Sequence, residues 1–456
     1  MKIDPDIFKA YDIRGIYPNS LNEEIAYRIG KAYAKLLNDE NPSRKLTIVV
    51  GSDMRISSPQ LKTSIIKGLI DSGVNVVDVG LVTTPTFYFS VAYYGYDGGL
   101  QVSASHNPKE WNGLKMVRKR GVPISGDSGM YKIRDLVIKN HFTKKNRPGI
   151  ITQKTNVVEE LLEQEIKEWQ IDLSEMKPLK VVVDTANAIG ILDIEVMFKN
   201  LPVKLNKLNS KLDGTFPVHE PDPLKDENLE YVQKEVIKRQ ADIGISIDGD
   251  ADRYFFVDNH GEVIRQEILR GIMAQLALKK YPKSKICYDI RPGKITLDLI
   301  KEAGGIPIVT KVGHSLIKEQ MIKEEAVFAG ESSGHYYYKF SFGSFDAPMV
   351  LTLEFLRFIS EKNKPLSDII KPYKKYFHSG EINSLIEDKE GKIKELSEKY
   401  ADGNPNFLDG ITIEYKDWWF NVRPSNTENK LRLNLEAKTK ELMERKRDEV
   451  LKLIRT

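Results

Sequence analysis

One pattern occurs three times along the chain: a β-rich run, a polar loop, a helical stretch and a second β-rich run. The copies cover Leu46–Val79, Lys180–Leu208 and Lys285–Val309. Short β-branched runs that alternate with helices are typical of βαβ units, in which helices cover a largely parallel sheet. The repeat therefore predicts an α/β protein with three similar mixed α/β domains in series.

The C-terminal part of the chain departs from this repeat. Three β-rich runs lie close together between Ile411 and Leu435, and Glu441–Ile454 has the pattern of an amphipathic helix. Strands followed by a helix predict a smaller C-terminal α+β domain. We expect domain I at residues 1–147, domain II at 148–254, domain III at 255–371 and domain IV at 372–456.

Composition restricts the classes of function. The 456 residues include 69 Lys and Arg and 65 Asp and Glu, and a net charge of +4 is too small for a nucleic-acid-binding surface. The single cysteine, Cys287, excludes an intramolecular disulfide and a cysteine-rich zinc site. The chain has no apolar stretch of signal-peptide or membrane-spanning type, so we expect a cytoplasmic protein with no membrane contact.

The strongest local motif is the acidic loop in Ile245–Val257, ISIDGDADRYFFV. Asp248, Asp250 and Asp252 alternate between two β-rich runs. Three adjacent carboxylates repel one another, and a hard divalent cation such as Mg²⁺ relieves that repulsion. An acidic turn between strands is the alternative. An EF-hand loop is excluded, because its glycine and its closing glutamate are both missing at the required spacing.

A second motif is Gln101–Met116, QVSASHNPKEWNGLKM. Ser105 and His106 lie in a turn-forming stretch after an apolar run, and Lys115 follows. A loop serine near basic groups can carry a phosphoryl group covalently. The same string is also typical of an Asx turn without a catalytic role.

A third motif, Ala329–His335, reads AGESSGH. It matches the nucleophile elbow of α/β-hydrolases, but an aromatic β-like run follows in place of the required helix, so we reject the elbow. A loop that offers one carboxylate and hydroxyl groups suits hydrogen bonds to sugar hydroxyls. A tight glycine turn is the alternative.

A fourth motif, Asn421–Glu428, reads NVRPSNTE. A guanidinium group, two hydroxyls and an amide in one turn suit a phosphate dianion, and a hairpin turn between strands is compatible with that role. The residues concerned are Arg423, Ser425, Asn426 and Thr427.

Four further positions carry weaker patterns. Tyr11 and Arg14 lie in FKAYDIRG, which is either a site segment or a surface ion pair. Arg291 follows the end of a β-rich run, where ligands gather in α/β sheets. His314 is either a ligand-binding residue or a residue at the start of a helix.

Taken together, the segments YDIRG, SASHNP, DGDADR, GESSGH and RPSNT resemble the motifs of the α-D-phosphohexomutase family, in family order and over nearly the whole chain. The resemblance is to its bifunctional phosphomannomutase/phosphoglucomutase members. It implies four domains around a central cleft, three of them α/β and a smaller α+β fourth.

The resemblance also implies roles for the residues in these motifs. It implies a phosphoserine at Ser105, which ligates Mg²⁺ together with the acidic trio. Lys115 matches a family residue that we take as the general acid/base. The remaining catalytic candidates are Arg14, His106, Arg253 and His335; the substrate-binding candidates are Tyr11, Arg291, His314, Glu331, Ser333, Arg423, Ser425, Asn426 and Thr427.

The implied reaction is reversible phosphoryl transfer between hexose 1-phosphate and hexose 6-phosphate, of glucose or mannose or both, through a bisphosphorylated sugar. Glucose 1,6-bisphosphate or an equivalent would prime the enzyme. We expect phosphosugar substrates, no nucleic-acid or membrane partner, and a monomer or homodimer. Ser332 stands where bifunctional members often have Met and aminosugar mutases often have Gln, so the preferred sugar stays open.

Three alternatives remain. The first is a phosphoglucosamine mutase. The second is a haloacid-dehalogenase-like phosphotransferase, in which Asp248 would become the aspartyl-phosphate, although its mid-chain position and the repeat argue against it. The third is a non-catalytic sugar-phosphate binding protein.

Overall fold

The computed structural model of the protein describes residues 3–142, 147–291, 293–425 and 429–456. The chain forms two compact units. Unit 1 consists of Met1–Val263 with Ser333–Ser367, and unit 2 consists of Ile264–Ser332 with Asp368–Thr456. Within the described ranges, no helix is both long enough and apolar enough to cross a bilayer.

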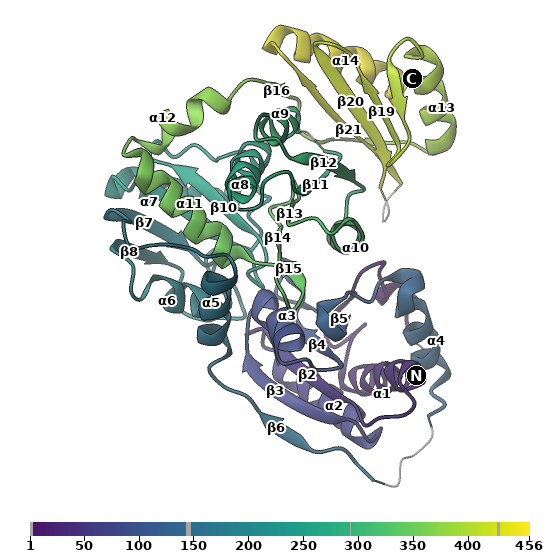
Figure 1. The fold of residues 1–456 in the computed structure, drawn as a ribbon. Helices are drawn as coiled ribbons and strands as arrows, with labels where there is room; N and C mark the ends of the chain where they lie inside the picture. The colour runs from purple at the N-terminus through teal and green to yellow at the C-terminus, as the bar shows by residue number, and fades with distance from the viewer. Residues whose placement is uncertain (1–2, 143–146, 292, 426–428) are drawn as a thin grey trace. The chain divides into compact units, whose positions relative to one another are not determined.

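The first sheet of unit 1 has the order β1-β5-β4-β2-β3-β6 (Figure 1). β2 pairs in parallel with β3 and β4, whereas β5 pairs antiparallel with β4 and β1. The strands are β1 (Ile13–Ile16), β2 (Thr47–Ser52), β3 (Asn75–Leu81), β4 (Gly98–Val102), β5 (Trp111–Arg118) and β6 (Ile151–Gln153). Its helices are α1 (Glu23–Glu40), α2 (Ser58–Asp71), α3 (Thr84–Tyr93) and α4 (Tyr131–Lys139).

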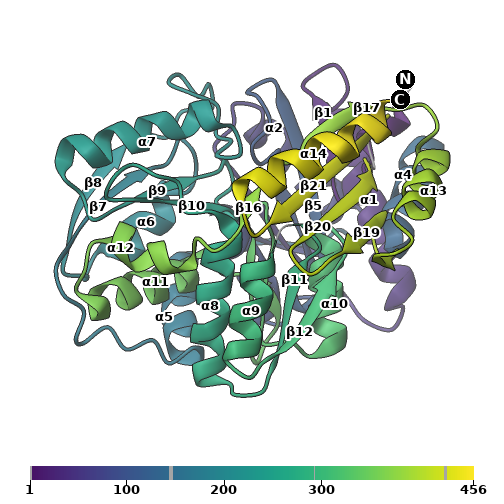
Figure 2. The ribbon, with the colours of Figure 1, turned by 90° about the horizontal axis from the view of Figure 1, so that it is seen from above.

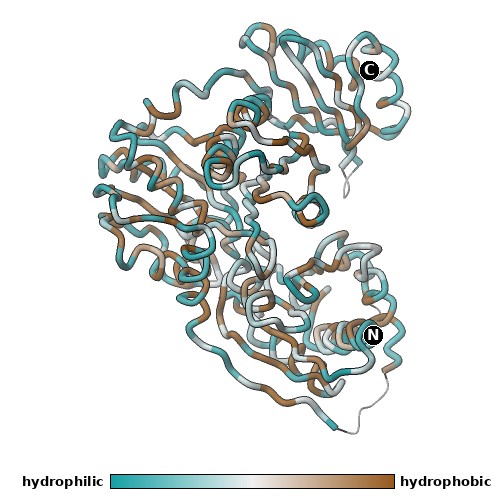
Figure 3. The backbone as a smooth tube through the Cα atoms, viewed as in Figure 1, coloured by the Kyte–Doolittle hydropathy of each residue, from teal (hydrophilic) through white to brown (hydrophobic). Residues whose placement is uncertain are grey.

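Helices cover both faces of this sheet. A Cβ atom on Gly98 of β4 would meet Tyr33 of α1, and one on the next residue, Gly99, would meet Phe87 of α3. Successive residues of a strand point to opposite faces, so α1 and α3 lie on opposite sides of the sheet. Apolar residues, brown in Figure 3, run along these central strands.

The second sheet of unit 1 has the order β10-β9-β7-β8. β7 pairs in parallel with β8 and β9, and β10 pairs antiparallel with β9. Its elements are β7 (Leu179–Asp184), β8 (Val203–Leu208), β9 (Ile243–Ile247), β10 (Tyr254–Asp258), α5 (Val157–Glu168), α6 (Ile191–Phe198) and α7 (Asp226–Arg239). Unit 1 also contains the antiparallel pair β14 (Tyr336–Lys339) and β15 (Ser344–Asp346), and α11 (Pro348–Lys362).

Unit 2 begins with a third α/β arrangement. β11 (Lys285–Asp289) pairs in parallel with β12 (Ile306–Thr310) and β13 (Phe328–Gly330). The helices are α8 (Gln266–Lys280), α9 (Lys294–Glu302) and α10 (His314–Glu324).

The C-terminal part of unit 2 is an antiparallel sheet with its own apolar core. Its strands follow the order β16-β21-β20-β19-β18, and β17 also pairs with β21. Helix α14 lies across β21 (Figure 2). The elements are β16 (Phe377–His378), β17 (Ile382–Leu385), β18 (Asn404–Asn406), β19 (Ile411–Glu414), β20 (Trp418–Pro424), β21 (Lys430–Ala437), α13 (Lys389–Lys399) and α14 (Lys440–Arg455); the short helix α12 spans Leu366–Ile370.

The predicted fold class of three mixed α/β domains and a smaller α+β domain is confirmed. The C-terminal domain has more strands than expected, since the sequence patterns predicted only the strands now seen as β19, β20 and β21. β16, β17 and β18 are two to four residues long, too short to show a clear alternation of apolar and polar residues. The domain boundaries and the central cleft stay predictions.

Candidate active site

The serine singled out by its loop lies between β4 and β5 in unit 1. Ser105 is buried, and its backbone has the left-handed conformation, with a φ of 51°. The Ser103 hydroxyl accepts a hydrogen bond from the Ser105 amide at 3.0 Å and so stabilises the bend. Non-glycine residues with this conformation are uncommon, and they cluster at functional sites.

The acidic trio lies in the turn between β9 and β10, also in unit 1. Asp248, Asp250 and Asp252 are buried, and one oxygen of each lies within 4.8 Å of the others. The Ser105 hydroxyl donates a hydrogen bond to Oδ2 of Asp248 at 3.0 Å. The structure thus brings the serine loop and the acidic loop together, although they are 143 residues apart in sequence.

Gly249 permits this close approach. A Cβ atom on Gly249 would lie 2.2 Å from the carbonyl oxygen of Ser105, far inside van der Waals contact. The Gly249 amide also donates a hydrogen bond to the carbonyl oxygen of Pro221 at 3.1 Å, which fixes the acidic loop. Any larger residue at this position would push the two loops apart.

Arg253 and His106 surround the serine hydroxyl. Arg253 donates from Nε to Oδ2 of Asp248 at 2.9 Å and from Nη2 to Oγ of Ser105 at 3.4 Å. Nδ1 of His106 lies 3.1 Å from the same hydroxyl and also contacts the Arg253 guanidinium. Burial, together with the cations Arg253 and Arg14, holds the pKa of His106 well below 6.5, so this imidazole is neutral near pH 7.

Lys115, on β5, binds two of the three carboxylates. Its Nζ lies 2.7 Å from Oδ2 of Asp250 and 2.5 Å from Oδ2 of Asp252. Burial alone would lower the pKa of Lys115, but these carboxylates raise it well above its usual value. Burial raises the pKa of Asp248, which shares the site with two other carboxylates, whereas Lys115 keeps the pKa of Asp252 low despite its burial.

The acidic trio fits a divalent cation of the Mg²⁺ type. Among the described residues, none donates a hydrogen bond to Oδ1 of Asp250 or to Oδ1 of Asp252, although both atoms are buried. Oδ1 of Asp252 has only the longer contacts with Arg253 at 3.8 Å and His335 at 3.7 Å. Buried carboxylate oxygens without hydrogen-bond donors are costly, and a cation with oxygen ligands satisfies them. All ligand atoms are oxygens, which suits Mg²⁺ better than zinc or copper.

Other predicted residues of unit 1 lie close to this cluster. Arg14 forms an ion pair with Asp12 at 2.8 Å, but it also donates hydrogen bonds to the Ala104 carbonyl and to the Asn107 side chain, so it supports the serine loop. His335 pairs with Arg253 through the backbone, and its Nδ1 lies 3.0 Å from Asp346.

For two further predicted residues of unit 1, burial is the main observation. Tyr11 is half-buried in the segment before β1. The Ser333 hydroxyl is buried, and it has no hydrogen-bond partner among the described residues.

In unit 2 the predicted sugar-binding residues lie near the ends of the parallel strands. Arg291 follows β11; its Nη2 lies 2.9 Å from Oε1 of Glu331, and its Nε pairs with Asp289 at 2.5 Å. His314 is the first residue of α10, and its Nδ1 lies 3.0 Å from the hydroxyl of Ser315. Arg291 and Glu331 thus come together, as ligand-binding residues at strand ends do.

The predicted phosphate-binding residues of unit 2 centre on Arg423, near the end of β20. Its cross-strand neighbour in β21 is Arg432, which donates a hydrogen bond to the Ser425 hydroxyl at 3.2 Å. Asn426 and Thr427 lie outside the described residues.

A carboxylate that the sequence did not single out joins these arginines. Glu381 accepts hydrogen bonds from Arg423 at 2.9 Å and from Arg432 at 3.2 Å. Burial would raise the pKa of Glu381, but Arg423, Arg291 and Arg432 keep it below its usual value. Glu381 therefore holds the two guanidinium groups in place, a role visible only after the strands are paired.

Arg55, in the loop after β2, is a further functional residue that no sequence motif marks. Its guanidinium donates to the carbonyl oxygens of Ser105 at 2.7 Å and Asn107 at 2.6 Å. It also donates to the carbonyl oxygens of Pro108 at 2.8 Å and Trp111 at 3.1 Å. Four bonds from one buried side chain shape the serine loop, but the only hint in the sequence was a charged residue in a loop after a strand.

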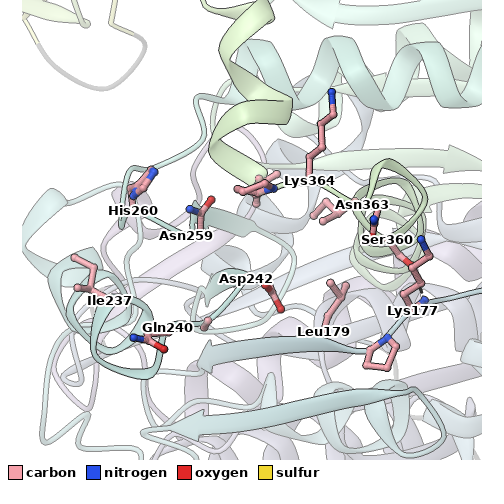
Figure 4. A pocket seen from close by; sticks show the side chains of 15 residues that line it. Lys177, Leu179, Ile237, Gln240, Asp242, Asn259, His260, Ser360, Asn363 and Lys364 are labelled. Atoms are coloured by element: carbon pink, nitrogen blue, oxygen red, sulfur yellow. Dashed lines mark hydrogen bonds between the residues drawn. The ribbon is translucent and has the colours of Figure 1, made fainter.

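A cavity of about 600 Å³ opens in another part of unit 1 (Figure 4). It lies beside the ends of α7 and α11, and its lining includes Lys177, Asp242, His260 and Lys364. None of the predicted site residues lines it. The chemically distinctive cluster around Ser105 and this cavity are therefore separate features.

Comparison with known proteins identifies the same four-part organisation. The phosphoglucomutase/phosphomannomutase models of alpha/beta/alpha domains I, II and III match residues 5–144, 159–261 and 267–376, and the model of the C-terminal domain matches residues 381–453. A phosphomannomutase of Vibrio cholerae is 38% identical over 98% of this chain and 98% of its own length. One from Methanocaldococcus jannaschii is 37% identical over 98% of this chain and 97% of its own.

A solved structure agrees with these relatives. A phosphoglucomutase/phosphomannomutase family protein from Burkholderia thailandensis superposes with a TM-score of 0.91 at 31% identity, covering 99% of this chain and 98% of that one. The four matched domains and the full-length relatives together show that the chain belongs to the phosphoglucomutase/phosphomannomutase family of phosphohexomutases.

Proposed function

We propose that this protein interconverts hexose 1-phosphates and hexose 6-phosphates, of glucose or mannose or both, through a phosphoserine at Ser105. The observation that carries the proposal is the buried contact between the Ser105 hydroxyl and the acidic trio. A nucleophilic oxygen beside a cation site is the arrangement that phosphoryl transfer requires, since this chemistry depends mainly on positioning and charge stabilisation. The names of the full-length relatives support the substrate class.

In the first half-reaction, a sugar hydroxyl oxygen forms a bond to phosphorus while the bond between phosphorus and Oγ of Ser105 breaks. The sugar hydroxyl loses its proton, Oγ regains one, and the product is a bisphosphorylated sugar. The second half-reaction reverses these events with the other phosphate, which returns to Ser105. Atoms balance over the cycle, and the net result is movement of the phosphate between positions 1 and 6.

The residues around Ser105 have distinct roles in this scheme. Arg253 donates to Oγ and stabilises the charge that develops there. By family resemblance Lys115 would be the general acid/base; Asp250 and Asp252 lie within 2.7 Å of its Nζ and raise its pKa, which favours the protonated form that can donate a proton. Asp248, Asp250 and Asp252 would hold Mg²⁺, which when bound offsets the negative charge of the phosphoryl oxygens.

We assign the substrate-binding roles by family resemblance. Glu331 and Ser333 would bind the sugar hydroxyls. Arg423, Ser425, Asn426 and Thr427 would bind the phosphate that is not reacting, and Arg423 and Arg432 already form a basic pair there. We also propose a cytoplasmic location, and glucose 1,6-bisphosphate or an equivalent as the primer.

Ser105→Ala tests the central assignment. We expect kcat to fall by at least about 1000-fold with an unchanged circular dichroism spectrum, because the phosphoryl carrier is lost. Ser174→Ala, at an exposed position, is the matched control and should retain full activity. Near-normal turnover of Ser105→Ala would refute the assignment.

Peptide mapping of the purified enzyme separates the remaining chemistries. An acid-stable phosphate on Ser105 supports the proposal, and a hydroxylamine-labile phosphate on Asp248 would support the aspartyl-phosphate alternative instead. Rates compared side by side for glucose, mannose and glucosamine phosphates then fix the sugar. No turnover of any of them would leave only a binding protein.

A further inference from the structure

We propose, building on the cation site in the proposed function, that Thr84 is a positioning residue whose hydroxyl fixes the orientation of the Asp250 carboxylate. Thr84 is the first residue of α3 and falls in the stretch matched by family domain I. Asp250 falls in the stretch matched by family domain II. The cation site would therefore depend on a side chain from a domain that supplies none of the three aspartates.

Two hydrogen bonds join Thr84 to Asp250. The hydroxyl donates to Oδ2 of the carboxylate at 2.6 Å, and the backbone amide donates to the carbonyl oxygen of the same residue at 3.0 Å. Both side chains are fully buried, with 0% exposure. One residue thus holds both the main chain and the side chain of Asp250.

These contacts leave one carboxylate oxygen free for a ligand. Oδ2 of Asp250 is occupied by Thr84 and by Lys115, which lies 2.7 Å away. Oδ1 is buried and accepts no hydrogen bond from the described residues. The Thr84 hydroxyl therefore helps to hold Oδ2 and leaves Oδ1 as the oxygen available to a cation.

The neighbouring threonine has a different partner. Thr83 caps α3, and its hydroxyl donates to Oδ2 of Asp193 at 2.8 Å, not to the acidic trio. Two consecutive hydroxyls at one helix end thus bind two different carboxylates, so the role of Thr84 can be separated from that of the helix end as a whole.

Partners that orient metal ligands are typically worth a factor of about 10–100 in metal affinity. Thr84→Val removes the hydroxyl with little change in volume, which frees the Asp250 carboxylate to rotate. Loss of the Thr84 hydroxyl also makes the Asp250 carboxylate more basic, and this opposing effect favours cation binding. Lys115 limits the effect, because it still pairs with this carboxylate. We expect the loss of orientation to dominate.

The test is a Mn²⁺ titration of the full-length, metal-stripped protein, followed by the electron paramagnetic resonance signal of free Mn²⁺. Thr84→Val should bind Mn²⁺ about tenfold more weakly or worse, and Thr84→Ser should restore binding to within about threefold of wild type. If Thr84→Val does not fold, Thr84→Ala, which loses the hydroxyl and the γ-methyl group, provides the comparison.

Two controls make the outcome decisive. Thr83→Val removes the adjacent hydroxyl, and Thr352→Val removes a buried hydroxyl of α11 that donates to the Pro348 carbonyl. Both should keep wild-type Mn²⁺ affinity even where they lower the melting temperature. Equal weakening by Thr83→Val and Thr84→Val, or unchanged binding by Thr84→Val, would overturn the role of Thr84.

Failure of the cation site itself has a different readout. Wild-type protein that binds no Mn²⁺, or that binds it equally well after Asp250→Asn, would overturn both the proposed cation site and the role of Thr84. Binding that Asp250→Asn abolishes and Thr84→Val leaves intact would overturn the role of Thr84 alone.

Discussion

Ser105 reaches the acidic loop through a backbone conformation that most residues avoid. Its left-handed φ, the hydrogen bond from its amide to Ser103 and the missing side chain at Gly249 act together. Conformations of this kind cost of order 1–3 kcal/mol each and persist only where the surroundings enforce them. At the scale of single residues, the site therefore depends on the strained backbone of Ser105 and on its close packing against Gly249.

Gly249→Ala tests this close contact. The added methyl group would overlap the Ser105 carbonyl oxygen, so the two loops must separate, and we expect a loss of about 1–3 kcal/mol in stability together with a large fall in kcat. Denaturant unfolding and steady-state kinetics measure both. In Gly126→Ala, the control, the three atoms nearest to the new Cβ would all belong to the Tyr131 side chain, the closest at 3.3 Å. Full activity in Gly249→Ala would contradict the proposed geometry.

The serine loop is organised by the loop that follows β2. Arg55 donates to four carbonyl oxygens of the segment from Ser105 to Trp111, and its guanidinium lies 3.3 Å from Asp53 and 4.9 Å from the centre of the Phe216 ring. A planar group with five donors can make such a set of bonds, and an ammonium cannot. The loop therefore keeps its shape because a neighbouring loop supplies the donors.

Arg55→Lys keeps the positive charge but removes the planar guanidinium group that donates the four hydrogen bonds. We expect kcat to fall by about 100-fold, because a displacement of the serine by about 1 Å is enough for such a loss, while KM for the sugar phosphate changes little. Hydrogen exchange over residues 103–111 should rise in the variant. A large rise in KM with an unchanged kcat would instead place Arg55 in substrate binding.

The elements themselves could be predicted well from the sequence. β7 spans Leu179–Asp184 and begins one residue before the second copy of the repeat, because buried parallel strands are nearly continuous β-branched runs, here Val181–Val183. The roles of Arg55 and Thr84 could not be predicted, since their partners lie 50 and 166 residues away and follow no local period. Glu381 was missed for the same reason: its partners depend on strand pairing.

At the scale of the whole molecule, burial of carboxylates links stability to pH. Asp193, on α6, is fully buried; burial raises its pKa to about 7, and the hydroxyls of Thr83 and Thr86 oppose the shift. Glu165 is buried nearby, and burial together with Asp193 raises its pKa as well. The folded protein thus retains protons that the unfolded chain releases.

The sign of the pH dependence follows from this difference. Between the ordinary pKa of 3.8 and about 7, the unfolded state binds fewer protons at Asp193 than the folded state, so stability falls as pH rises. Asp193→Asn removes this dependence and keeps an acceptor for Thr83. We expect the variant to gain melting temperature over wild type at pH 7.5 and to lose most of that gain at pH 4. An identical difference at both values would contradict a protonated Asp193.

The two threonines at the start of α3 have a consequence for recombination among relatives. Thr83 and Thr84 lie in one family domain, and their carboxylate partners lie in the next. Consider a hybrid protein that joins residues 1–147 of this chain to the remainder of a homologue. In it, the threonine hydroxyls come from this chain and their carboxylate partners come from the homologue. Such a hybrid should form an active site only where the homologue has aspartates at the positions of Asp193 and Asp250.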